Sequence, residues 1–209
     1  MTGKESKKMD RMIFATSNEG KVREVRGMLK EYGTDVITMK EAGIDADIDE
    51  NGTTFVENAV IKAKTVMELS GQPAIADDSG LEVDYLGGMP GIYSARYLGH
   101  DTSYDIKNAH IIDELSGVPD EKRTARYVCA MAAAFPDGEI ITCEETFEGI
   151  IAREPAGENG FGYDPIVYVP EFGMTTGQMT PEFKNSISHR GKALKKMREL
   201  LKGKFADRK

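Results

Sequence analysis

The sequence predicts an α/β protein with a mixed central β-sheet that is flanked by helices. Strand and helix patterns alternate in the first half of the chain, as in sheets whose parallel strands are joined by helices. Two long extended runs then flank the turn signal Pro136-Asp137-Gly138, which indicates a hairpin. The length of 209 residues suits one domain, or two lobes that share a sheet.

The first predicted elements follow a tail at residues 1–11 that we expect to be flexible. Residues 12–15 read as a buried strand, and residues 36–38 as a short one. Between them lies a helix whose apolar face is formed by Val22, Val25, Leu29 and Tyr32. An acidic loop at residues 45–52 precedes a second helix at about residues 54–70, with an apolar stripe of Phe55, Ala59, Ala63 and Val66.

The middle of the chain contains an acidic pair. Residues 74–76 form a strand that we expect to end at Asp77-Asp78, where Ser79-Gly80 would reverse the chain. Residues 81–83 then form a second short strand, and the glycine-rich residues 87–91 a loop. Residues 103–115 form a helix.

The remaining elements complete the sheet. The hairpin strands are residues 126–135 and 139–151, and the first contains an apolar stretch typical of a central strand covered on both faces. Residues 157–162 form a glycine-rich loop, and residues 166–169 the last strand. Ser188 caps a terminal helix that carries Ala193, Leu194, Met197, Leu200 and Leu201.

Composition argues against several classes of function. The chain has 27 Lys and Arg against 35 Asp and Glu, a net charge of −8, so we expect no nucleic-acid partner. The longest apolar run, residues 128–135, is too short to span a bilayer, and the polar start is not a signal peptide. We therefore expect no membrane partner, a cytoplasmic location, and buried reduced thiols at Cys129 and Cys143.

Residues 16–21, Thr-Ser-Asn-Glu-Gly-Lys, suit an anion. They lie between a strand and a helix, where backbone N–H groups favour a phosphate and Lys21 adds a positive charge. Ala15 and Val22 exclude a P-loop, which needs Gly and Ser or Thr there. Taken alone, the segment fits a simple helix cap equally well.

Adjacent carboxylates at Asp77 and Asp78 repel each other, and a cation would relieve them. Mg²⁺ is commonly shared between one or two carboxylates and the phosphates of a substrate. Only one of the pair needs to face a site, because neighbours in a strand point to opposite faces. Asp49 and Glu50 are further candidate ligands, although a solvated turn explains them as well.

Two further features favour a nucleotide. Lys62 lies within the apolar arc of its helix, so it either extends along the surface to water or contacts an anion. Residues 157–164 offer adaptable backbone and two aromatic rings, and donor groups gather at Lys184, Ser188, His189 and Arg190. Such donors suit a base that presents carbonyl oxygens and disfavour adenine. Capping and solvation would also explain His189 and Arg190 individually.

Six collinear segments resemble the inosine triphosphate pyrophosphatase family, also called dITP/XTP pyrophosphatases, over about residues 12–201. They are residues 16–21, 54–63, 76–81, 90–96, 160–165 and 188–190. The resemblance implies an elongated α/β fold with a mixed sheet and a cleft between two lobes, formed by residues 12–203, and a homodimer. One departure is Ser17, where Gly is frequent in relatives.

The resemblance also implies residue roles. Asp78 would be the general base and, with Glu50, would bind one Mg²⁺ per subunit; Asp49 remains an alternative ligand. Phosphate and nucleotide contacts would come from Thr16, Ser17, Asn18, Glu19, Gly20, Lys21, Lys62, Ser79, Phe161, Gly162, Tyr163, Asp164, Lys184, His189 and Arg190.

The implied reaction is Mg²⁺-dependent hydrolysis of ITP, dITP or XTP to the monophosphate and pyrophosphate, which removes deaminated purines from the nucleotide pool. Two alternatives remain. One is a pyrophosphatase for modified pyrimidine or methylated nucleotides, since the phosphate and metal groups say little about the base. The other is a nucleotide sensor without turnover.

Overall fold

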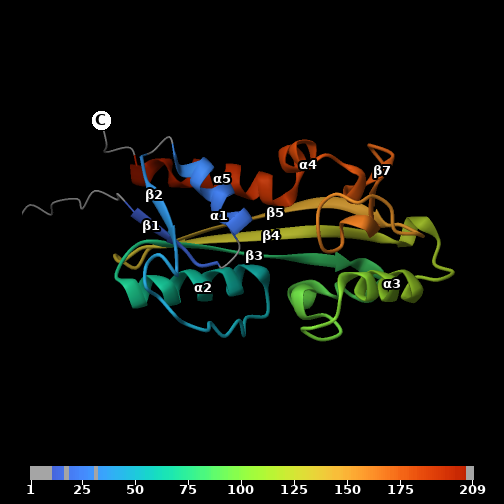
Figure 1. Cartoon of the computed structure of the whole chain (residues 1–209), viewed down its shortest axis with the longest axis horizontal. Coiled ribbons are helices and arrows are strands. Elements are labelled where there is room, and N and C mark those ends of the chain that lie inside the picture. The colour runs from blue at the N-terminus through green and yellow to red at the C-terminus, as the bar shows by residue number, and fades with distance from the viewer. Residues whose placement is uncertain (1–10, 17–18, 31–32, 206–209) are drawn as a thin grey trace, which may run out of the picture. The chain divides into compact units, whose positions relative to one another are not determined.

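The computed structural model describes residues 11–16, 19–30 and 33–205. Its sheet has the strand order β2-β1-β3-β4-β5-β6-β7 (Figure 1). The strands are β1 (Arg11–Phe14), β2 (Asp35–Thr38), β3 (Ala74–Val83), β4 (Thr124–Ala134), β5 (Ile140–Ile151), β6 (Val167–Val169) and β7 (Met174–Thr175). β1 runs parallel to β2 and β3, whereas β6 is antiparallel to β5 and β7. The predicted mixed α/β sheet is therefore confirmed.

The chain divides into two compact units. The first comprises the described residues up to Asp77, Ala130–Cys143, and the described residues from Ala193 onward. The second comprises Asp78–Cys129 and Glu144–Lys192. The boundary in β3 falls within the acidic pair, between Asp77 and Asp78.

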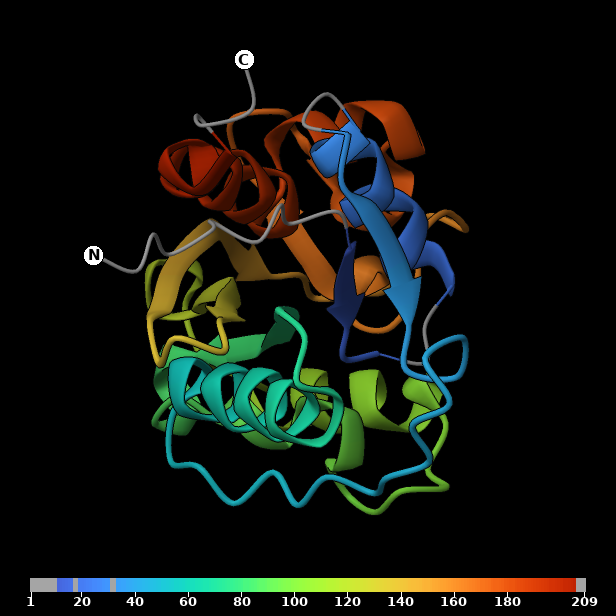
Figure 2. The same ribbon diagram turned by 90° about the vertical axis from the view of Figure 1, so that its left-hand side faces the viewer.

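The first unit contains α1 (Glu19–Leu29) and α2 (Phe55–Ser70). β1 and β2 lie side by side with α1 next to them (Figure 2, blue). The described apolar faces are buried as predicted, at Val22, Val25, Leu29, Phe55, Ala59, Ala63 and Val66. Thr54 caps α2 by accepting a hydrogen bond from Glu57 N at 3.1 Å, and Gly71 ends it in the left-handed conformation.

The second unit has its own core. Side chains of β3 and α3 (Tyr104–Glu114) pack there with those of β4, β5 and β6, among them Leu81, Ile111, Tyr127, Ile151 and Val167. The guanidinium of Arg123 is buried in this unit and donates to the carbonyls of Leu115, Ile151 and Ala152 at 2.7–2.8 Å. Two helices follow, α4 (Pro181–Ile187) and α5 (His189–Phe205), and α5 continues into the first unit.

Two predictions about strands are wrong, and one helix was not predicted. β3 does not end at the acidic pair but continues without a reversal from Ala74 to Val83. β6 is not the last strand, because the two-residue β7 follows it, and α4 was not predicted. Leu200 is 44% exposed, so it does not belong to the buried face of α5.

Other predictions concern the termini and the cysteines. The tail was predicted to include residues 1–11, but Arg11 begins β1, so that boundary is wrong by one residue. The rest of the predicted tail, and Tyr32, lie outside the described residues. Cys129 and Cys143 are both buried and form no disulfide. None of the helices in the described ranges is long and apolar enough to cross a membrane.

Candidate functional site

The predicted phosphate segment joins β1 to α1 in the first unit. β1 ends at Phe14, and α1 begins at Glu19, so the backbone N–H groups of its first turn have no partner within the helix. Ala15 N donates to Ile75 O at 2.8 Å, which holds the end of β1 against β3. Thr16 is half-buried; Ser17 and Asn18 lie outside the described residues. A helix N-terminus is therefore present where an anion was predicted.

Lys21, in the first turn of α1, connects this segment to the acidic pair. Its ammonium group lies 2.8 Å from Asp77 Oδ2, and the Asp77 side chain is only 3% exposed. The two segments are separated in sequence by more than fifty residues. The predicted phosphate-binding and acidic segments therefore meet inside the first unit.

The two aspartates differ in their surroundings. Asp77 is buried, whereas Asp78 and Ser79 are half-buried. This difference follows from the alternation of side chains along a strand, since consecutive residues point to opposite faces. Asp77 is engaged with Lys21, so Asp78 is the member of the pair with access to water.

Glu50 and Lys62 form a second ion pair in the first unit. Lys62 Nζ lies 3.1 Å from Glu50 Oε2, with the side chains 12% and 32% exposed. Lys62 therefore contacts an anion, which resolves the alternative left open by the sequence. The loop that carries Glu50 is fixed to the start of α2, because Gly52 N donates to Asn58 Oδ1 at 2.9 Å and Thr53 N to Glu57 Oε2 at 2.6 Å.

Glu50 in the first unit and Asp78 in the second each carry carboxylate oxygens, the ligands that Mg²⁺ prefers. The position beside Glu50 attracts a positive charge, as its contact with the Lys62 ammonium shows. Within the described ranges, no three His, Cys, Asp or Glu residues are grouped to hold a metal by themselves. The residues present thus suit an ion that is shared with the phosphates of a substrate.

Asp164 organises the predicted base-binding residues of the second unit. Its Oδ2 accepts hydrogen bonds from Phe161 N at 2.7 Å and from Lys184 Nζ at 2.5 Å. Its Oδ1 accepts from Tyr127 OH at 3.1 Å and from Thr176 Oγ1 at 2.9 Å. A buried carboxylate that accepts from this many donors is held in one orientation.

Of the two aromatic rings in the glycine-rich loop, only Phe161 is exposed, at 66%. The Lys184 ammonium lies 5.0 Å from the centre of its ring. Tyr163 instead packs in the core, where its hydroxyl donates to Ser94 O at 2.8 Å and burial raises its pKa. Asn108 Nδ2 donates to Gly162 O at 3.1 Å and supports the loop from α3.

His189 and Arg190 begin α5. Ser188 Oγ accepts from Gly191 N at 3.2 Å, which confirms the predicted cap. Arg190 is half-buried. His189 is 8% exposed, and its ring stacks on that of Tyr127 with the centroids 4.9 Å apart and 14° between the planes.

The structure therefore brings the predicted residues together in two groups. The first unit pairs Lys21 with Asp77 and Lys62 with Glu50. The second unit gathers Phe161, Asp164, Lys184 and His189, together with Tyr127 and Thr176. No motif in the sequence marks Tyr127 or Thr176 as part of this group; the signal for Tyr127 is a hydroxyl within a strand that otherwise reads as core.

Comparison with known proteins gives consistent matches. A sequence model of the Ham1 family matches residues 12–200. The dITP/XTP pyrophosphatase of Bacillus licheniformis is 50% identical over 194 residues, which cover 92% of this chain and 98% of the relative. That of Escherichia coli K12 is 45% identical over 197 residues, with 93% and 99% covered.

Solved structures agree. The HAM1 protein from Coxiella burnetii has a TM-score of 0.88 and 38% identity, with 93% of this chain and 100% of that chain covered. The Ham1 protein of Staphylococcus aureus has the same TM-score and identity, with 93% and 99% covered.

Proposed function

The chain belongs to the Ham1 family, and on this basis we propose that it hydrolyses the deaminated purine nucleotides dITP, ITP and XTP to the monophosphate and pyrophosphate. The observation in the structure that best supports this function is the contact of Lys21 with Asp77, because it joins a phosphate-binding helix terminus to the acidic strand. Residues 12–203 would work as a single pyrophosphatase domain. Its substrates belong to the nucleotide pool, so we propose a cytoplasmic location.

The phosphate end of the substrate binds residues 16–21. Backbone N–H groups at the start of α1 donate to phosphate oxygens, and Lys21 supplies a positive charge beside them. Lys62, which forms an ion pair with Glu50 in the structure, is a second cation that can bind the triphosphate. Fixing the triphosphate in this way aligns the bond to be cleaved with the attacking water.

Asp78 acts as the general base. It is half-buried, whereas Asp77 is buried against Lys21, so Asp78 is the carboxylate of the two that water reaches and that can accept a proton from it. Glu50 and Asp78 would also hold Mg²⁺, which when bound neutralises phosphate charge and that of the leaving pyrophosphate.

The base end of the substrate binds the second unit. The exposed ring of Phe161 offers a stacking surface, and Lys184, His189 and Arg190 offer donors to carbonyl oxygens. Adenine presents an amino group at the six position in place of a carbonyl oxygen, so these donors would have no acceptor there and adenine would bind less well. Asp164 positions this group through its hydrogen bonds to Phe161 N and Lys184, and does not itself read the base.

A substrate panel tests the function. ITP, XTP, GTP and ATP are compared with Mg²⁺ and with EDTA, together with a methylated purine and a modified pyrimidine triphosphate. We expect ITP and XTP to be preferred and EDTA to stop the reaction. A preference for the modified pyrimidine or methylated nucleotide would support the alternative pyrophosphatase, and thermal stabilisation by ITP without turnover would support a sensor.

A further inference from the structure

Tyr127 lies in β4, in a stretch of buried residues, and is only 7% exposed. A buried hydroxyl is costly unless it forms a hydrogen bond. The Tyr127 hydroxyl donates to Asp164 Oδ1 at 3.1 Å and has Thr176 Oγ1 at 3.5 Å. Burial and the negative charge of Asp164 raise its pKa well above the usual value, so the hydroxyl remains protonated and remains a donor.

The ring of Tyr127 makes a different contact. It stacks on the His189 imidazole at a centroid distance of 4.9 Å and an interplanar angle of 14°. Parallel rings at this separation adopt the favourable offset arrangement. Because the ring N–H bonds of histidine lie in the imidazole plane, the stack fixes the plane in which His189 can donate.

Tyr127 therefore contacts both parts of the base-binding group. Through its hydroxyl it contacts Asp164, which holds Phe161 N and Lys184. Through its ring it contacts His189. An aromatic side chain with two torsions, anchored at its far end, is a rigid spacer between these groups.

Building on the proposed function, we propose that Tyr127 is a positioning residue that holds His189 in the plane needed to recognise the carbonyl oxygen of a deaminated purine. Tyr127 does not touch the substrate. Loss of Tyr127 should therefore reduce discrimination between bases. A misaligned His189 would lose its hydrogen bond to the carbonyl oxygen of ITP, whereas ATP has no such oxygen and would be bound as before.

Two variants separate the ring from the hydroxyl. Tyr127→Leu removes the stack, whereas Tyr127→Phe keeps the stack and removes only the bond to Asp164. Phe147→Leu is the matched control, since Phe147 is an aromatic core residue of the same unit with the same 7% exposure. The readout is the ratio of kcat/KM for ITP to that for ATP, which does not depend on the fraction of folded protein.

We expect Tyr127→Leu to lower this ratio by about 10-fold or more, the size of effect that a misplaced specificity contact produces. Tyr127→Phe should keep it within about 3-fold, and Phe147→Leu should leave it at the parental value. If Tyr127→Leu does not accumulate as folded protein, Tyr127→Met fills the core with a flexible side chain and serves the same purpose.

A parental ratio in Tyr127→Leu or Tyr127→Met would overturn the inference, and so would an equal loss in Phe147→Leu. A loss in Tyr127→Phe as large as in Tyr127→Leu would show that the stack is not the cause. Failure of the parent protein to prefer ITP would instead overturn the proposed function, so the two results are distinguishable.

Discussion

At the scale of single residues, two lysine–carboxylate pairs determine the charge around the proposed phosphate site. Lys21 and Asp77 are largely buried, and so is Lys62 beside Glu50. Removing one member of such a pair leaves a poorly solvated charge, so these residues are expected to affect stability as well as binding. Asp78 is half-buried, so it is more exposed than Asp77.

The adjacent aspartates should therefore separate chemistry from stability. Asp78→Asn should lower kcat for ITP by at least ~10²-fold, the contribution of a general base, without unfolding the protein. Asp77→Asn should lower the free energy of unfolding by about 2 kcal/mol. Breaking a fully buried pair costs ~3–5 kcal/mol, and the cost is smaller here because Lys21 is partly exposed to solvent. Steady-state kinetics and urea denaturation measure the two effects. Near-parental turnover in folded Asp78→Asn would rule out its assigned role.

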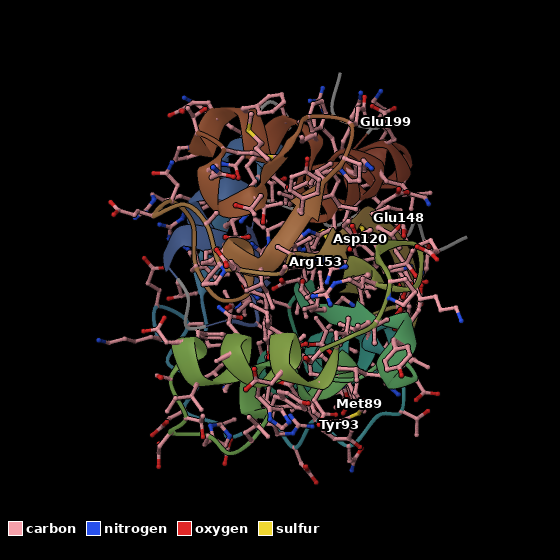
Figure 3. The ribbon with its side chains drawn as sticks, turned by 90° about the vertical axis from the view of Figure 1, so that its right-hand side faces the viewer. Met89, Tyr93, Asp120, Glu148, Arg153 and Glu199 are labelled. Atoms are coloured by element: carbon pink, nitrogen blue, oxygen red, sulfur yellow. The ribbon has the colours of Figure 1, made fainter. Side chains whose placement is uncertain are left out.

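Arg123 is a buried cation whose guanidinium donates to backbone carbonyls. Its guanidinium satisfies three backbone carbonyls, so Arg123→Leu should lower the free energy of unfolding by about 3 kcal/mol or more, at ~1–3 kcal/mol per lost partner. Arg153, whose exposed side chain pairs with Asp120 (Figure 3), is the control, and Arg153→Leu should cost under about 1 kcal/mol. Equal shifts in the urea midpoint would contradict this account.

At the scale of elements, most helices and strands follow from local patterns. The apolar stripe of α2, its Thr54 cap and its Gly71 terminus are all readable in the sequence. The full length of β3 could not be read from the sequence, because Asp77, Ser79 and Gly80 have low strand propensity. The structure accommodates Asp77 within the strand by pairing it with Lys21, a contact that no local pattern reveals.

The glycine-rich loop owes its shape to a close approach. Gly160 has φ +81°, and an added methyl group would overlap Asp164 Oδ2. Gly160→Ala should therefore displace this carboxylate from Lys184 and lower kcat/KM for ITP by about 10-fold or more. Gly173 is the control, because it also has positive φ but an added methyl group would meet only Tyr168 OH, at 4.0 Å, an ordinary contact. Gly173→Ala should therefore cost only ~1–2 kcal/mol of strain. Equal activity of the two variants would contradict the prediction.

At the scale of the whole molecule, the sequence predicts which segments form the site better than how their side chains pair. Motif order and donor chemistry identify residues 16–21, the acidic strand and the start of α5. The hydrogen bonds of Tyr127 and Thr176 to Asp164 depend on residues far apart in the chain, which only the folded sheet brings together. The burial of Tyr163 was missed for the same reason.

The predicted homodimer stays a proposal, and the second unit offers a surface for it. Several large apolar side chains between residues 84 and 106 are individually exposed: Tyr85, Met89, Tyr93, Leu98, Tyr104 and Ile106. A second copy could cover the surface around Tyr93. Met89 and Tyr93 come from one turn and are labelled in Figure 3. If a second copy covers this surface, Tyr93→Glu should convert a dimer to a monomer in light scattering. The control is Leu69→Glu, at an exposed position on α2, which should leave the protein dimeric. If the Tyr93→Glu protein is still a dimer, the interface lies elsewhere.

The proposed reaction breaks the bond between the α and β phosphates, and ³¹P NMR of the products formed from ITP and Mg²⁺ shows which bond is cleaved. Resonances of inosine monophosphate and pyrophosphate should rise together in equal amounts, and both should rise at least ~10²-fold more slowly with Asp78→Asn. Inosine diphosphate with orthophosphate would contradict the account, because the terminal phosphate would then be the one removed.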